Sequence, residues 1–216
     1  MADTTKAPTA ETYDNFQFAY DFYNQALFGN SLPNCIITMQ RKNRSFGYFA
    51  PNRWEDTEDR ERTDEIALNP THFDARPAIE TLSTLVHEMV HLWQHHYGDK
   101  PPKSANHNKE WAEEMKRVGL MPSSTGEAGG KETGKKVSHY ILPDGDFSEV
   151  SKTLINDHGW VLPYVSKDPE TSKKKASAAS KTKFSCPECQ ENCWGKPTLS
   201  VLCEECGVKM EPEVKE

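Results

Sequence analysis

A chain of 216 residues is long enough for one sizeable core and a small additional module. Its net charge of −7 argues against indiscriminate binding to nucleic acid. No stretch approaches the ~18 consecutive apolar residues of a membrane span, which argues against a membrane partner. The N-terminal residues lack the basic and apolar pattern of a secretory signal, so we expect a cytoplasmic protein.

The first part of the chain is expected to form one helix and a small sheet. Residues 1–10 carry no apolar pattern and are predicted to be disordered. Over residues 11–28 aromatic side chains recur at three- and four-residue steps, which is typical of an amphipathic helix that ends at Gly29. Three extended stretches then predict a small antiparallel sheet, with an acidic loop at 54–64: residues 35–40, 46–49 and 65–69.

Two further helices are expected in the middle of the chain. Pro77 opens the first, whose apolar residues follow the 3.6-residue period as far as Gly98. The second covers about 108–118, with Asn106 or Asn108 as its N-cap. Residues 137–142 and 160–165 are then predicted to be short strands or extended segments.

The first of these helices carries the motif His-Glu-Met-Val-His. Its two histidines, His87 and His91, are one helical turn apart and project from the same face. Neutral imidazoles in that arrangement can both bind one zinc ion at about 2.0–2.1 Å. Glu88 lies between them in sequence, where its carboxylate can take a proton from a zinc-bound water. The motif therefore predicts a hydrolytic zinc site with Glu88 as its base.

A catalytic zinc needs a third protein ligand and an open fourth position. His95 continues the four-residue spacing, but each such step rises ~6 Å along a straight helix, so three successive histidines cannot converge on one ion. His107 is well placed beyond the turn that follows Gly98. Three glutamates of the next helix are alternatives: Glu110, Glu113 and Glu114.

The segments HEMVHLWQHHYG and NHNKEWAEEM together resemble the SprT-like metalloprotease family. In that family a third histidine begins the helix after the motif, with an aromatic residue soon after, which implies that His107 is the third ligand and that Trp111 is the aromatic. The resemblance implies an α+β, zincin-like metalloprotease domain over residues 11–165 and a C-terminal zinc ribbon. It also implies a zinc metallopeptidase, with proteins attached to DNA as one class of substrate.

The C-terminal part contains five of the six cysteines. Two CxxC pairs separated by thirteen residues are typical of a structural zinc ribbon, which we place at 184–216: Cys186, Cys189, Cys203 and Cys206. Cys193 breaks this pairing and is interpreted as a spare thiol, with replacement of Cys189 as the alternative. The preceding segment, 166–183, is a Lys-, Ser- and Ala-rich linker.

Secondary roles are assigned to a few other residues. The stretch 66–69 is a candidate strand for binding the substrate backbone. His139 or Tyr140 could stabilise the developing oxyanion, but a structural role is favoured for each. Gln94 lies near Glu88 along the helix and is a candidate supporting residue.

The leading hypothesis is a zinc-dependent peptidase that acts on protein substrates and uses one catalytic and one structural zinc. The alternative is a non-catalytic zinc-binding adaptor of the transcription or replication machinery. A third hypothesis is an enzyme that uses metal-assisted hydrolysis on a bond other than the peptide bond. DNA is a candidate partner, because residues 167–183 contain six lysines and two acidic residues. The sequence pattern predicts no oligomeric state.

Overall fold

The computed structural model describes residues 6–101, 106–166 and 182–213 of the chain. The chain divides into two compact units, unit 1 from Met1 to Lys167 and unit 2 from Asp168 to Glu216. Most of the predicted linker, residues 167–181, lies outside the described residues, as do the first five residues of the predicted disordered N-terminus. In the described parts no helix combines the length and apolar character needed to cross a membrane.

The first helix, α1 (Pro8–Phe28), begins earlier than predicted, so residues 8–10 are helical and not disordered. Proline is tolerated in a first turn because its missing N–H would have no partner within the helix. The helix ends as predicted at Gly29, whose φ of 60° is left-handed. Its aromatic stripe lies in the core of unit 1: Phe16, Tyr20, Tyr23 and Phe28.

Three strands form the main sheet of unit 1, in the order β1-β3-β2. Their bounds are Ile36–Met39 (β1), Gly47–Glu55 (β2) and Arg62–Leu68 (β3). β2 and β3 are antiparallel, but β1 and β3 are parallel, so the predicted antiparallel sheet is wrong for one of its pairings. The chain crosses from β1 to the far edge, runs back as β2 and returns between them as β3. Apolar patterns identify strands but not their neighbours.

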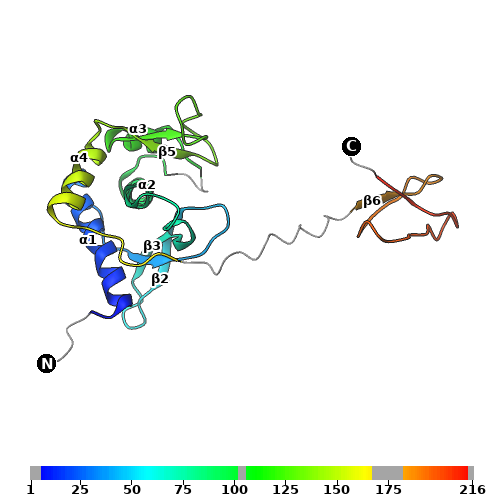
Figure 1. Ribbon diagram of the computed structural model, residues 1–216, viewed down its shortest axis with the longest axis horizontal. Coiled ribbons are helices and arrows are strands. Elements are labelled where there is room, and N and C mark those ends of the chain that lie inside the picture. Colours follow the sequence, from blue (N-terminus) through cyan, green and yellow to red (C-terminus); the bar gives the residue numbers. More distant parts are fainter. Residues whose placement is uncertain (1–5, 102–105, 167–181, 214–216) are drawn as a thin grey trace. The chain divides into compact units, whose positions relative to one another are not determined.

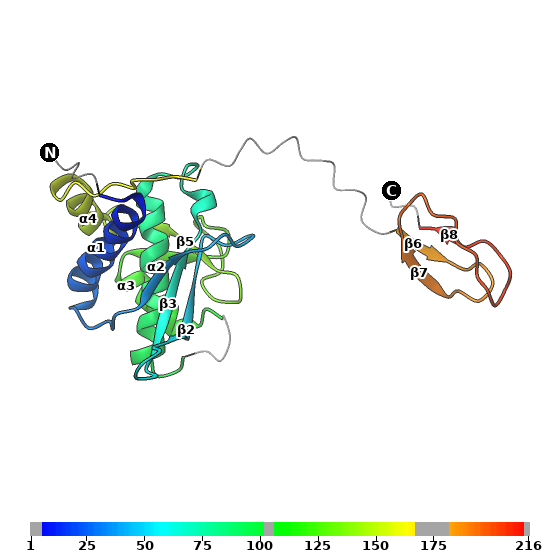
Figure 2. The same cartoon turned by 90° about the horizontal axis from the view of Figure 1, so that it is seen from below.

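The helix α2 (Ala78–Tyr97) lies in the middle of unit 1 and begins and ends where predicted, between Pro77 and Gly98. Figure 1 shows it nearly end-on, with the sheet on one side, α3 and β5 on the other, and α1 and α4 flanking it. Figure 2 shows β2 and β3 running alongside it. Because neighbours cover most of its surface, twelve of its side chains are buried, polar ones included.

Unit 1 is completed by elements that follow α2. The predicted second helix is α3 (Lys109–Arg117), and it is capped by the Asn108 side chain, which accepts a hydrogen bond from the Trp111 N–H at 3.0 Å. An antiparallel pair of strands follows, β4 (Leu120–Ser123) and β5 (Ser138–Ile141). The predicted α+β class is therefore confirmed at the level of helices with small sheets.

The last part of unit 1 differs from the prediction. A helix that we did not predict, α4 (Asp146–Lys152), continues into a π-helical turn, η2 (Thr153–Asp157). The strand considered for 160–165 does not form, and this segment is extended but unpaired. Trp160 instead donates its indole N–H to the carbonyl of Asn15 at 2.8 Å. An extended segment can thus be held by side-chain contacts with α1, without a neighbouring strand.

Unit 2 is a small sheet around a cysteine cluster. Its strands are β6 (Thr182–Ser185), β7 (Asn192–Gly195) and β8 (Glu211–Pro212), in the order β7-β6-β8. Among residues 182–213, its cluster of buried apolar side chains consists of Phe184, Met210 and two cysteines. Such a small apolar core gives little free energy of folding by itself.

Candidate metal centre

Two histidines of α2 and one that precedes α3 meet in unit 1. The ring centroids of His87 and His91 lie 5.2 Å apart, as expected for residues one helical turn apart. The ring of His107 lies 5.5 Å from that of His87 and 4.9 Å from that of His91. One ring nitrogen from each residue can be chosen so that all three lie within 4.8 Å of one another. The structure therefore brings together the three residues predicted as ligands of the catalytic zinc.

Hydrogen bonds determine which ring nitrogens remain available for a metal ion. Nδ1 of His107 is 3.0 Å from the Gly134 carbonyl oxygen, which can only accept, so Nδ1 carries the proton and Nε2 has a free lone pair. Nδ1 of His87 is 3.0 Å from Nδ1 of His139, whose Nε2 is 2.9 Å from the Ser83 hydroxyl. If His87 donates to His139 and His139 to Ser83, Nε2 of His87 is also free. Ligating histidines are commonly held in this way through their second nitrogen.

The pKa values of these rings keep them neutral at neutral pH. Burial lowers the pKa of His87 well below its usual value, and the neighbouring histidines lower it further. Burial also lowers the pKa of His91 to about 3 and that of His139 to about 4. Burial also lowers the pKa of His107, and the hydrogen bond to Gly134 opposes this shift. Neutral imidazoles are the form that binds metal ions, so the group fits a zinc-class cation.

Trp111 of α3 forms the wall behind the histidines. Its ring is fully buried and stacks on His91, with centroids 5.2 Å apart and planes 21° apart. The ring of His107 packs edge-on against it, with centroids 4.3 Å apart. Large rigid rings limit the rotation of side chains packed against them. The aromatic residue that the family resemblance implied therefore packs against all three candidate ligands, since its ring also lies 4.9 Å from that of His87.

Glu88 lies beside the histidines and is 5% exposed. Its carboxylate accepts a hydrogen bond from the backbone N–H of Phe49 in β2. Burial raises the pKa of this carboxyl to about 8, against the opposing effects of the Phe49 N–H and of Lys42. A buried carboxylate with a raised pKa is a stronger base than an exposed one, which suits a residue that must accept a proton near neutral pH.

Gly47 allows β2 to lie directly on α2 beside Glu88. A Cβ at this position would meet the Ala67 carbonyl oxygen at 2.8 Å, Cγ2 of Thr84 at 3.0 Å and Oε1 of Glu88 at 3.3 Å. The first contact is with backbone that cannot move aside. Glycine is thus required for the close approach that places the Phe49 N–H against Glu88.

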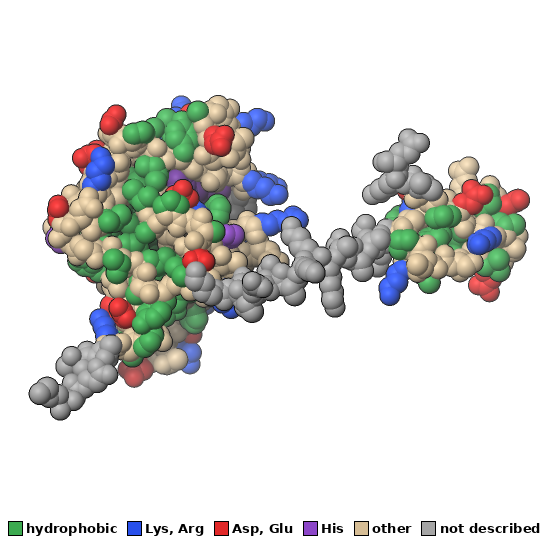
Figure 3. All heavy atoms as spheres, in the orientation of Figure 1, with side chains coloured by type: hydrophobic (Ala, Val, Ile, Leu, Met, Phe, Trp, Pro, Cys, Tyr) green, Lys and Arg blue, Asp and Glu red, His purple; other side chains and the backbone are tan. Residues whose placement is uncertain are grey.

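A cavity of about 650 Å³ opens over this group. Its lining includes Glu88 and the three histidines on one side and the β2 residues Gly47 to Phe49 on another. In the space-filling view, histidine side chains reach the surface within a hollow of unit 1 (Figure 3). The candidate metal centre is therefore open to a ligand from solvent.

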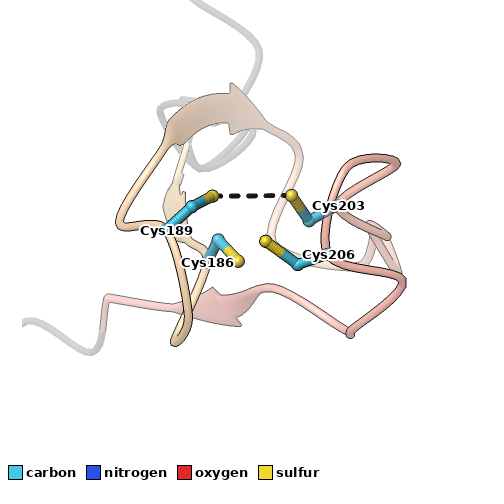
Figure 4. A group of neighbouring side chains, drawn as sticks. All are labelled: Cys186, Cys189, Cys203 and Cys206. Carbon is cyan, nitrogen blue, oxygen red and sulfur yellow. Dashed lines mark hydrogen bonds between the residues drawn. The ribbon is translucent and has the colours of Figure 1, made fainter.

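The four ribbon cysteines form a second candidate metal group, in unit 2. The Sγ atoms of Cys186, Cys189, Cys203 and Cys206 lie within 4.8 Å of one another, and Figure 4 shows them pointing toward a common centre. The Cys189 backbone N–H lowers the pKa of the Cys186 thiol to about 7. Cys193 lies outside the group, with its sulfur 3.8 Å from that of Met210. Four thiols on two paired turns fit a tetrahedral zinc ion.

Comparison with known families identifies the chain. The model of the SprT-like family matches residues 16–132, just over half of the sequence. The chain belongs to the SprT-like family. An "uncharacterized protein in mucB 3'region" of Salmonella typhimurium is 51% identical over 59 residues, which cover 27% of this chain and 80% of that protein. The comparison with solved structures gave no match. The predicted resemblance is therefore confirmed.

The SprT-like match includes the three histidines and Glu88 but ends before His139 and before unit 2. The rival third ligands are absent from the histidine group and have other partners. Glu110 accepts hydrogen bonds from Gln94 and from the Asp99 N–H, Glu114 pairs with Arg117, and Glu113 pairs with Lys109. Gln94 therefore ties α2 to the start of α3, where it also bonds to Asn108.

One secondary assignment is corrected by the structure, and the contacts of His139 become clear. The stretch 66–69 was the candidate for strand pairing with a substrate, but β3 is the central strand and pairs on both sides. The edge strands are β1 and β2, of which β2 lines the cavity, and a buried apolar pattern does not reveal which strand is at an edge. Both ring nitrogens of His139 have partners, His87 and Ser83, which fits the structural role favoured for it from the sequence. No sequence pattern predicts these two contacts, because His139 is 52 residues from His87 and 56 residues from Ser83.

Proposed function

We propose that this SprT-like protein is a zinc-dependent metallopeptidase with a zincin-like catalytic domain. The observation that carries the proposal is the buried Glu88 carboxylate beside three convergent, neutral histidines in an open cavity. His87, His91 and His107 would hold the catalytic zinc, and the four cysteines of unit 2 would hold a structural one. When bound, zinc supplies a Lewis acid that polarises the scissile carbonyl and makes the attacking water more acidic.

Glu88 is the group that moves protons. Its carboxylate accepts one from the attacking water and can return it to the leaving amine, which completes hydrolysis of the peptide bond. Burial helps this exchange by raising the pKa of Glu88 to about 8 in the metal-free protein. The Phe49 N–H holds the carboxylate in place against β2.

The free edge of β2 is the surface that we assign to the substrate backbone. The Phe46 carbonyl bonds to the Asn69 N–H on the β3 side at 2.8 Å, so the alternation of an antiparallel strand turns the polar groups of Gly47 and Phe49 toward the free edge. These groups line the cavity. At present the Gly47 carbonyl accepts from the Ser45 hydroxyl and the Phe49 N–H donates to Glu88. An extended peptide can pair with such an edge by strand addition.

The decisive experiment compares Glu88→Gln with wild type on a labelled unfolded protein such as casein, with and without single-stranded DNA. We expect turnover to fall about 10²–10⁴-fold because the base is lost, while zinc content stays unchanged. Glu113→Gln, which changes an exposed glutamate of α3, is the matched control. His107→Ala should lose the unit 1 zinc. Cleavage by Glu88→Gln at the wild-type rate would contradict the proposal.

The same experiment separates the peptidase from a non-catalytic adaptor, because an adaptor keeps its biological activity in Glu88→Gln. It also tests DNA as a partner. The lysine excess of residues 167–183 supports a contact with the phosphate backbone. We expect DNA to stimulate cleavage by the wild-type protein. This stimulation should be lost when those lysines are replaced by serine. Equal cleavage without DNA would remove that partner and leave the peptidase.

A further inference from the structure

A third group of potential metal ligands lies at the end of α2, apart from the three-histidine group. It contains Asp64 of β3 and the adjacent residues His95 and His96, and one ligand atom from each lies within 4.8 Å of the others. We propose that these residues form an additional site for a zinc-class divalent cation. The site is independent of the proposed peptidase activity, since it shares no ligand with the three-histidine group.

Asp64 is the anchor of this site because its carboxylate is buried and fixed in orientation. The residue is 4% exposed. One oxygen accepts the Asn52 backbone N–H at 2.7 Å and the other lies 2.6 Å from Nε2 of His96. Asn52 lies in the irregular part of β2 between Ala50 and Trp54 and has a φ of 51°, so the bulge turns its N–H toward Asp64.

The Asp64 carboxylate has no lysine or arginine partner in the described part of the chain. The residue at ion-pair distance from this carboxylate is His96, through its ring nitrogen Nε2. A buried carboxylate is costly unless a positive partner or a metal ion compensates it. A divalent cation between Asp64 and the two imidazoles would supply that charge.

His95 and His96 add two nitrogen donors from the last turn of α2. Their ring centroids lie 4.8 Å apart. The C-terminal end of a helix carries partial negative charge, which favours a cation at this position. The His96 side chain is 36% exposed, so water can complete the coordination of an ion. Two imidazoles and one carboxylate are a donor set for zinc and similar transition metals, whereas calcium and magnesium prefer oxygen ligands.

The site would reinforce the contact between two elements that the Asp64–His96 hydrogen bond already joins. Asp64 belongs to the β2–β3 hairpin, and the histidines belong to α2. The His95 ring also packs near Phe49 of β2, with centroids 5.8 Å apart, and lines the cavity of unit 1. An ion held here would therefore fix the hairpin to the helix at the rim of that cavity.

The test is a titration of the full chain, first loaded with two equivalents of zinc, with Co²⁺ followed by calorimetry and visible absorption. Wild type should bind one further ion with a nitrogen–oxygen spectrum that lacks thiolate bands. Asp64→Asn, which keeps the side-chain shape, and His95→Gln, on the partly exposed rim, should each weaken this event by at least about tenfold. His158→Gln changes a histidine outside the three groups and should not.

Two results would overturn the proposal. One is the absence of a third binding event in wild type, which would leave Asp64 and His96 as a structural hydrogen bond only. The other is a third event of unchanged affinity in both Asp64→Asn and His95→Gln, which would place the ion elsewhere on the surface. Because His95→Gln removes no buried charge, it keeps the test valid even if Asp64→Asn does not fold.

Discussion

Nδ1 of His87 and Nδ1 of His139 lie 3.0 Å apart, and the second ring nitrogen of His139 is 2.9 Å from the Ser83 hydroxyl. His139 comes from β5 and Ser83 from one turn before His87 on α2. The chain of contacts determines which nitrogen of His87 faces the cavity. If the histidine group holds a metal ion as proposed, His139 would act on it as a positioning residue, through His87.

Replacing His139 should weaken zinc binding in unit 1 without removing a ligand. We expect His139→Phe to lower the zinc affinity by about 10–100-fold, because His87 loses the acceptor that holds its tautomer. His139→Gln should restore part of the affinity, since its amide can accept from His87. Competition with a chelator measures both. Tyr140→Phe, the next residue of β5, is the control, and a wild-type affinity in His139→Phe would show that the contact does not matter.

The raised pKa of Glu88 predicts how the stability of the metal-free protein depends on pH. The folded-state pKa of about 8 lies above the ordinary value of 4.5, so the folded protein holds this proton more tightly than the unfolded chain. The resulting stabilisation is complete below pH 4.5 and is lost as the pH rises toward 8. Glu88→Gln keeps a neutral side chain at every pH and should escape this loss.

Urea unfolding of chelated wild type and Glu88→Gln at about pH 5 and about pH 9 tests this dependence. From about pH 5 to about pH 9, the free energy of unfolding of the variant should increase relative to that of wild type by at least about 1 kcal/mol. The buried histidines titrate in both proteins, so their contribution cancels in the comparison. If the free energies of unfolding of the two proteins differ by the same amount at both pH values, Glu88 is not held in a neutral form.

Unit 2 should depend on metal for its folding. Its buried cluster is small, so four thiolates without an ion leave too little apolar burial to offset the chain entropy. Cys186→Ser combined with Cys189→Ser should remove one equivalent of zinc and the dispersed amide resonances of unit 2, with unit 1 unchanged. Cys193→Ser should keep both. Dispersed resonances in the double variant would refute a metal-dependent fold.

The candidate metal-binding pattern within α2 could be predicted because it is local. Backbone hydrogen bonds between residues four apart give the helix its period, and that period alone places His87 and His91 on one face. The same holds for the turns that carry the CxxC pairs and for the Asn108 cap of α3. Each depends on residues that are close in sequence, so the pattern determines the geometry.

Contacts between distant segments required the tertiary structure. The choice of His107 over Glu110, Glu113 and Glu114 depended on how α3 packs against α2, and sequence reasoning reached His107 only through the family resemblance. The parallel pairing of β1 with β3, the free edge of β2 and the contact of His139 with His87 likewise join segments that are far apart along the chain. These features arise from the packing of elements into one core, which balances many weak contacts at once and leaves no periodic signal in a single sequence.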